Sequence, residues 1–399
     1  ERPRSMPTFA AKWRAGHAAG GDMKAIPFLD LQTLHASIAG ELNDAMAKVM
    51  QHGQFIMGPE VRRFEHQFAN FTGARAAIGC ANGTAALHAA LCALEVGPGK
   101  EVILPSHTFI ATAEAVLLTG ARPVFVEVDE ETMLIDPAKI RAAFSARTAA
   151  IIAVHLYGMP CDMDALRAVA AERNVPIAED AAQAHGSTYK KKQAGTLGAV
   201  ASFSFFPGKN LGAFGDAGAV TTNDPSLART LRLYVNHGRE AKFEHLIVGN
   251  NYRLDTVQAA VLGVKLRHLE NWNLQRQRLA ARYLEHFSQE PFASFPVRVQ
   301  AAPAGAASTY HLMVVRIPRR DEIMDELHKR GVPTGLHYPI PCHLQPALRE
   351  LSDGPGSLVV TEKIAQQVLS LPMCPTFTLD DVDRICDIFR AVIIHSKVR

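Results

Sequence analysis

The chain is most informative at residues 202–220, SFSFFPGKNLGAFGDAGAV, where one lysine, Lys209, stands among aromatic, small and glycine residues. A lysine is normally a solvated surface charge. Apolar surroundings disfavour the ammonium form, and the neutral amine is a nucleophile that attacks carbonyl groups. This stretch therefore indicates a lysine that forms a covalent bond with an aldehyde or a ketone.

A carboxylate partner for this lysine lies upstream, in VPIAEDAAQAHG, residues 175–186. The segment reads as a short buried strand that ends at Glu179 and Asp180. A strand-end carboxylate ahead of a buried lysine is the pattern of a pyridoxal phosphate site, in which the lysine holds the aldehyde and the acid keeps the ring nitrogen protonated. Taken alone, Asp180 could equally cap a helix over residues 181–184.

Two further places could hold the phosphate of such a cofactor. Asn82, Gly83 and Thr84 open a predicted helix, where unpaired N–H groups and the helix dipole attract anions. Ser204 adds a hydroxyl shortly before Lys209. Each has an ordinary alternative, a capped helix or a buried serine, so neither is specific by itself.

The two faces of the ring need packing partners. Phe109, in PSHTFIATAEAV, follows a predicted strand and could stack on one face, although it could also be plain core. Gln183 could bond the ring hydroxyl or close the opposite face, although it could also be a surface amide. The order of all these residues along the chain, each at a strand end or a helix start, carries the cofactor hypothesis.

Short apolar strands alternate with helices from residue 26 onward, which predicts an α/β fold with a mostly parallel sheet covered on both faces. We expect strands at 76–79, 101–104, 123–128, 148–154 and 176–180, and helices at 41–50, 60–70, 85–94, 112–118 and 164–173.

The alternation of short strands and helices ends at residue 223. A long helical pattern over 255–289, bent or broken near Asn271, leads to an expected strand at 312–317 and helices at 321–330 and 380–394. We therefore expect a large cofactor domain over 23–260 and a bridging helix with a small α+β domain over 261–399. Residues 1–22 are expected to be a flexible extension.

Composition excludes several classes of function. A net charge of +3 over 399 residues gives no reason to expect a nucleic-acid partner, and no apolar run is long enough to cross a membrane. The six cysteines form no C-x-x-C pair, which argues against zinc and disulfides and fits the reduced cytoplasm.

The sequence lacks residues that the motifs of other cofactor, nucleotide and metal sites require. No G-x-G-x-x-G follows the first strand, so a nicotinamide dehydrogenase has no anchor. Asn210 stands where a phosphate-binding P-loop requires Ser or Thr. His337 and His343 lack an acidic residue nearby in the sequence, so we expect no metal site.

At this point the chain resembles the DegT/StrS-like family of pyridoxal-phosphate-dependent sugar aminotransferases. The matching motifs run almost to the C-terminus: IPFLDL (26–31), GPEVRRFEHQFANFTG (58–73), ANGTAALHAAL (81–91), PSHTFIATAEAV (105–116), EDAAQAHG (179–186), SFSFFPGKNLGAFGDAGA (202–219), NNYRLDTVQAAVL (250–262) and GLHYPIPCHLQP (335–346).

The resemblance implies a fold-type I aminotransferase architecture and a homodimer with its active sites at the interface. It makes Lys209 the Schiff-base lysine and Asp180 the partner of the ring nitrogen. The resemblance also implies that the phosphate is bound by Gly83, Thr84 and Ser204, and that the ring is contacted by Phe109 and Gln183. It implies that Asn251 makes a contact across the dimer, and that His337 and Tyr338 lie in the segment near the sugar.

The resemblance also implies a reaction, the transfer of an amino group from an amino acid, with L-glutamate expected, to a nucleotide-linked keto sugar. Related dehydrases carry histidine in place of the lysine, so Lys209 favours transamination. NLGAFGDAGA resembles members that aminate a 3-keto-hexose. An aminocyclitol (keto-inositol) aminotransferase and a noncatalytic regulator that keeps the fold remain open, with a nicotinamide oxidoreductase more distant.

Overall fold

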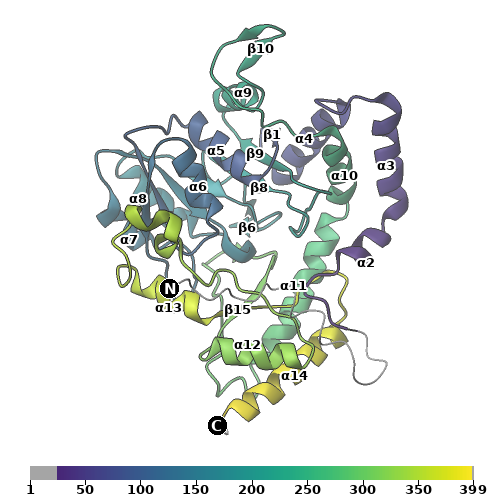
Figure 1. The fold of residues 1–399 in the computed structure, drawn as a ribbon, viewed down its shortest axis with the longest axis vertical. Coiled ribbons are helices and arrows are strands. Elements are labelled where there is room, and N and C mark those ends of the chain that lie inside the picture. The colour runs from purple at the N-terminus through teal and green to yellow at the C-terminus, as the bar shows by residue number, and fades with distance from the viewer. Residues whose placement is uncertain (1–24, 398–399) are drawn as a thin grey trace, which may run out of the picture.

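The protein is built around a seven-stranded sheet, seen in a computed structural model that describes residues 25–397 (Figure 1). The strand order is β1-β9-β8-β5-β4-β2-β3. Only β9 runs antiparallel to its neighbours, so the predicted α/β fold with a mostly parallel sheet is confirmed. The strands are β1 (Ala76–Cys80), β2 (Glu101–Pro105), β3 (Arg122–Val126), β4 (Thr148–Val154), β5 (Ile177–Asp180), β8 (Val200–Ser204) and β9 (Gly218–Thr222).

Helices cover both faces of this sheet at the β8 end. Successive residues of a strand point to opposite faces, and Val200 joins the cluster that includes α5 (Gly83–Ala93), whereas Ala201 joins the cluster that includes α4 (Pro59–Thr72) and α10 (Thr256–Leu266). The other helices beside the sheet are α6 (Ala111–Leu118), α7 (Pro137–Ala143), α8 (Met163–Ala171) and α9 (Pro225–Tyr234).

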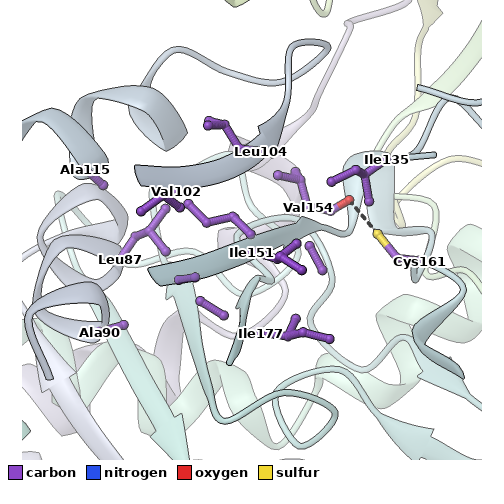
Figure 2. Packing of buried hydrophobic residues seen from close by; sticks show 14 of the residues in the cluster. Leu87, Ala90, Val102, Leu104, Ala115, Ile135, Ile151, Val154, Cys161 and Ile177 are labelled. Atoms are coloured by element: carbon purple, nitrogen blue, oxygen red, sulfur yellow. Dashed lines mark hydrogen bonds between the residues drawn. The ribbon is translucent and has the colours of Figure 1, made fainter. Parts of the chain in front are cut away.

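Buried apolar side chains fill the core between α5, α6 and the parallel strands (Figure 2). Strand β4 reads TAAIIAV, a continuous apolar run, because a parallel strand is buried on both faces. At its end the Cys161 thiol donates to the carbonyl of Val154 at 3.2 Å, drawn as the dashed line in Figure 2. The other labelled side chains are Leu87 and Ala90 of α5, Ala115 of α6, Val102 and Leu104 of β2, and Ile135, Ile151 and Ile177.

A second apolar core lies towards the C-terminus, around a three-stranded sheet of order β12-β14-β15 (Arg298–Val299, Met313–Arg316 and Val368–Leu371). Helices α11 (Leu269–Phe287), α12 (Arg320–Lys329) and α14 (Leu379–Lys397) pack there, at the bottom of Figure 1. Ile26 also belongs to this core, so the N-terminal end of the described chain packs against the C-terminal region.

The remaining elements are short or peripheral. Helices α2 (Leu31–Ala36) and α3 (Ala39–His52) flank α10, and α13 (Val359–Gln367) precedes β15. The two-stranded ribbon of β10 (Arg239–Ala241) and β11 (Glu244–His245) projects at the top of Figure 1. Strands β6 (Thr188–Tyr189), β7 (Lys192–Gln193) and β13 (Ala306–Ala307) form a small third sheet.

The predicted long helix over 255–289 is two helices. Helix α10 ends at Leu266 and α11 begins at Leu269, so the break lies just before Asn271, where we expected it. In the described part of the chain, no helix combines the length and apolarity needed to cross a bilayer. The prediction for residues 1–22 falls outside the described residues.

Candidate active site

Lys209 and Asp180 are brought together by two neighbouring parallel strands. Asp180 is the last residue of β5, and Ser204 is the last residue of β8, which pairs with β5 along the stretch 178–180. Lys209 follows in the tight turn after Ser204, where its N–H donates to the carbonyl of Phe206 at 2.8 Å. Carboxyl ends of parallel strands are the usual place for a ligand site in such a sheet.

The surroundings of the Lys209 amine favour its uncharged, nucleophilic form more than water does. The residue is half-buried, and burial lowers the pKa of its amine to about 8, while the negative charge of Asp180 acts in the opposite direction. Near neutral pH, a larger fraction of this amine is uncharged than for an exposed lysine.

The Asp180 carboxylate is fixed by two donors. The Thr112 hydroxyl donates to Oδ2 at 2.8 Å, and the N–H of Ala182 donates to Oδ1 at 3.2 Å. Residues 181–184 form turns and no helix, so Asp180 caps a turn. Because each carboxylate oxygen has two acceptor sites, these bonds orient the group and leave capacity for a protonated nitrogen.

The start of α5 meets the end of β8 at close range. A Cβ atom at Gly83 would lie only 2.6 Å from the Cβ of Ser204, so glycine permits this close approach. Asn82 caps the helix by accepting from the N–H of Ala85 at 2.8 Å. The first N–H groups of a helix, here including Thr84, have no partner within the helix and attract a phosphate.

Phe109, Gln183 and Tyr338 gather at one place. The rings of Phe109 and Tyr338 are 5.4 Å apart, and Phe109 is 53% exposed. The Gln183 amide nitrogen donates to the Tyr338 hydroxyl at 3.3 Å, and its oxygen accepts from the N–H of Tyr157 at 2.6 Å. Gln183 is therefore a buried, oriented amide and not a surface one.

The segment around His337 comes from the C-terminal region and lies against the cofactor side. The Tyr157 hydroxyl donates to the carbonyl of His337. The His337 ring bonds to the hydroxyl of Ser370 at 2.8 Å, and burial, together with the positive charge of Lys209, lowers its pKa to about 4. A neutral imidazole thus stands within the electrostatic reach of Lys209.

Asn251 precedes a short stretch of backbone that bonds to the end of β1. It is exposed and forms an isolated backbone bridge with Asn236. Among the interactions of residues 25–397, none joins Asn251 to Lys209, Asp180 or Ser204, although the carbonyl of its neighbour Tyr252 accepts from the N–H of Ala81 at 2.8 Å.

Sequence reasoning missed several residues of the site. Burial, and then the charge of Lys209, lower the pKa of His185 to about 3 and that of His311 well below its usual value. Thr112 and Tyr157 hold Asp180 and His337. Thr112 and His185 each lie inside a quoted motif, but their partners depend on the fold. In the described part of the chain, no cluster of acidic, histidine and cysteine side chains is arranged to hold a metal.

A family model described as the DegT/DnrJ/EryC1/StrS aminotransferase family matches residues 36–390. The chain belongs to this family of aminotransferases. It is 46% identical over 365 residues to the dTDP-3-amino-3,4,6-trideoxy-alpha-D-glucose transaminase of Streptomyces venezuelae, covering 92% of this chain and 95% of that protein. It is 43% identical over 361 residues to the UDP-2-acetamido-2-deoxy-3-oxo-D-glucuronate aminotransferase of Pseudomonas aeruginosa, covering 90% and 98%.

Solved structures of DegT/DnrJ/EryC1/StrS-like proteins agree with the fold. The crystal structure of DesV from S. venezuelae matches with a TM-score of 0.89 and 44% identity, over 92% of this chain and 98% of that one. The structure of NtdA from Bacillus subtilis, with bound cofactor PMP, matches with a TM-score of 0.87 and 32% identity, over 94% and 86%. The fold-type I aminotransferase prediction and the family prediction are confirmed.

Proposed function

We propose that this aminotransferase moves an amino group from L-glutamate to carbon 3 of a nucleotide-linked keto-hexose, with pyridoxal phosphate as cofactor. The observation that carries the chemistry is the Lys209 amine, whose pKa is lowered by burial, next to the oriented carboxylate of Asp180. The choice of carbon 3 rests on the names of the two relatives, which both refer to that position of the sugar.

The residues present fit this cofactor. Gly83, Thr84 and Ser204 form a cradle that suits a phosphate, because a side chain at Gly83 would fill it. Phe109 and Gln183 stand beside it for the ring, at the place where Tyr338 closes the group. When bound, pyridoxal phosphate supplies an electron sink that lets an amino group leave one carbon skeleton and join another.

Two side chains of the protein would hold and transfer the protons of the reaction. The carboxylate of Asp180 would hold the proton of the ring nitrogen with the acceptor sites that Thr112 and Ala182 leave free. The Nζ atom of Lys209, with a pKa of about 8, accepts a proton from the substrate carbon and returns it near neutral pH. The surrounding histidines stay neutral and do not compete for it.

The keto sugar would approach the segment of His337 and Tyr338, which lies beside Phe109 and Gln183. The two relatives carry different nucleotides in their names, dTDP and UDP, so the shared element of recognition is a 3-keto or 3-amino hexose and not one base.

The proposal includes the assembly of two copies of the chain into a homodimer. Apolar side chains are exposed on the β10–β11 ribbon and on the loop before α4: Phe243 is 85% exposed, Val248 94% and Ile56 51%. A second copy would bury such a surface and would bring its Asn251 to the phosphate cradle. A reduced cytoplasmic location also belongs to it, since the cysteines of the described chain are all free.

One experiment tests the reaction. Purified protein loaded with pyridoxal phosphate should be yellow, and its absorbance should shift when L-glutamate is added. A panel of nucleotide 3-keto-hexoses, nucleotide 4-keto-hexoses and keto-inositols is then offered to the aminated enzyme. Turnover restricted to the 3-keto-hexoses supports the proposal, while a preference for keto-inositols, or no glutamate response at all, contradicts it.

A further inference from the structure

The residue after Lys209 is locked in a buried network of hydrogen bonds. Asn210 is only 5% exposed. Its oxygen accepts from the Nδ1 of His311 at 3.1 Å, and its nitrogen donates to the oxygen of Asn273 at 2.9 Å and to the carbonyl of Thr309 at 3.2 Å. Because an unpaired buried amide is costly, this network permits one position of the turn that carries Lys209.

Asn273, on helix α11, continues the network towards Asp180. Its side-chain nitrogen donates to the carbonyl of His185 at 2.8 Å, and it packs so closely on Gly186 that a Cβ there would lie 2.8 Å from that nitrogen. His185 lies in the run of turns that starts after Asp180 and continues to Gly186. One asparagine on α11 thus bonds both to the lysine turn and to the acid segment.

The two segments come from different strands, and the backbone bonds of the sheet reach one residue beyond the strand ends, from Phe205 to Ala217 and from Ala181 to Ser202. Beyond these strand ends, each segment runs through turns, where the backbone has more freedom. The bridge from Asn210 through Asn273 to the carbonyl of His185 spans this freer part. Reactivity is sensitive to such placement, since a shift of about 1 Å can cost about 100-fold in rate.

We propose that Asn210 and Asn273 are positioning residues that hold the Lys209 amine in register with the Asp180 carboxylate. Neither side chain needs to touch the reacting atoms. The inference rests on the proposed function, in which Lys209 and Asp180 act on one cofactor ring. It also gives helix α11, which contributes to the second core, a direct connection to the catalytic turn.

Two variants break the bridge in different ways. Asn210→Ala removes the central amide, and Asn273→Leu keeps the branching and the number of side-chain heavy atoms without any hydrogen bond. Gln277→Ala is the matched control, because Gln277 lies one turn further along α11 and its amide donates to the carbonyl of Ser308 at 2.9 Å, with no bond to the lysine turn.

The first measurement uses protein without cofactor. Acetylation of Lys209 by a small reagent is followed against pH by mass spectrometry of its peptide. We expect both bridge variants to raise the pH midpoint of labelling by about half a unit or more, because the amine becomes better solvated. Gln277→Ala should keep the wild-type midpoint.

The second measurement uses the loaded enzyme with glutamate alone. Both bridge variants should lower the rate constant of the half-reaction about 10- to 100-fold, with the KM for glutamate changed less than about threefold. Melting temperatures are recorded for all variants, since Gln277→Ala should lose comparable stability without these changes.

Wild-type midpoints and rate constants in Asn210→Ala and Asn273→Leu would overturn the proposal, whatever their melting temperatures. If Asn210→Ala does not fold, Asn273→Leu decides. A wild-type protein that never responds to glutamate would instead contradict the proposed function, while the labelling midpoints would still report on the bridge.

Discussion

The hydroxyl of Thr112 donates a 2.8 Å hydrogen bond to Oδ2 of Asp180, and it bonds also to the hydroxyl of Thr108 at 2.9 Å. Helix α6, which begins at Ala111, thereby orients the carboxylate that ends β5. A hydrogen bond to a charged group is worth about 1.5–3 kcal/mol, enough to select one rotamer of a short side chain.

Thr112→Val should therefore lower kcat about tenfold, because Asp180 loses the donor that orients it while the shape of the site is kept. The measurement is kcat and KM for glutamate, together with retention of cofactor on dialysis. Thr119→Val is the control, since that hydroxyl caps the other end of α6 by bonding to Val116. Equal kinetics of the two variants would remove Thr112 from this role.

Gly83→Ala should weaken cofactor binding about tenfold or more, since the new Cβ would lie 2.6 Å from Ser204 Cβ and obstruct the cradle. The measurement is the Kd for pyridoxal phosphate from an absorbance titration. Gly40→Ala is the matched control, because no atom lies within 4 Å of a Cβ placed there. An unchanged Kd in Gly83→Ala would place the phosphate elsewhere.

Lys209→Met should stabilise the cofactor-free protein at pH 7. The pKa of Lys209 falls from 10.5 to about 8 on folding, so the unfolded chain binds more protons between these values. Stability of the wild type should thus rise with pH from about 8 to 10.5, and the advantage of the variant should shrink over this window. Urea unfolding at several pH values measures it.

The control for this pH dependence is Lys192→Met, which removes an exposed lysine on β7. It should change neither the stability at pH 7 nor its slope with pH. A Lys209→Met protein that shows no stability gain at pH 7, or a gain that grows above pH 8, would mean that the amine is not desolvated in the folded chain.

Tyr157→Phe should raise the KM for the keto sugar about tenfold and leave the glutamate half-reaction near wild type. The reason is that the Tyr157 hydroxyl holds the carbonyl of His337 in the segment proposed to face the sugar. Tyr189→Phe serves as control, because its hydroxyl bonds to Asp162 at 2.8 Å, away from that segment. A defect confined to the glutamate step would contradict this placement.

The sequence allowed the sheet and the candidate residues at strand ends to be predicted, because apolar runs and their terminal polar residues are local signals. Strand β9 was missed, since its neighbouring glycines hide a strand that runs antiparallel to the rest. The break between α10 and α11 was expected near Asn271 and lies just before it, between Leu266 and Leu269.

The polar network around Lys209 was beyond prediction for another reason. Asn210 meets Asn273 and His311 across 63 and 101 residues of sequence, and no spacing within one element announces such pairs. Asn251 stays a prediction, because its proposed contact needs a second copy. The domain boundary at residue 260 also stays a prediction. Ile26, which was assigned to the large domain, packs in the second core with residues of the C-terminal region.

The segment that follows Gly335 has a consequence for how a large substrate enters. Tyr157 bonds to His337, Gln183 bonds to Tyr338, and both the hydroxyl and the carbonyl of Ser106 bond into the stretch 342–343. A hinge that swings the C-terminal region away would have to break all these bonds at once. On the proposed function, discrimination would therefore rest on the fit of the sugar against a wall that is already in place, and not on closure of the C-terminal region around it.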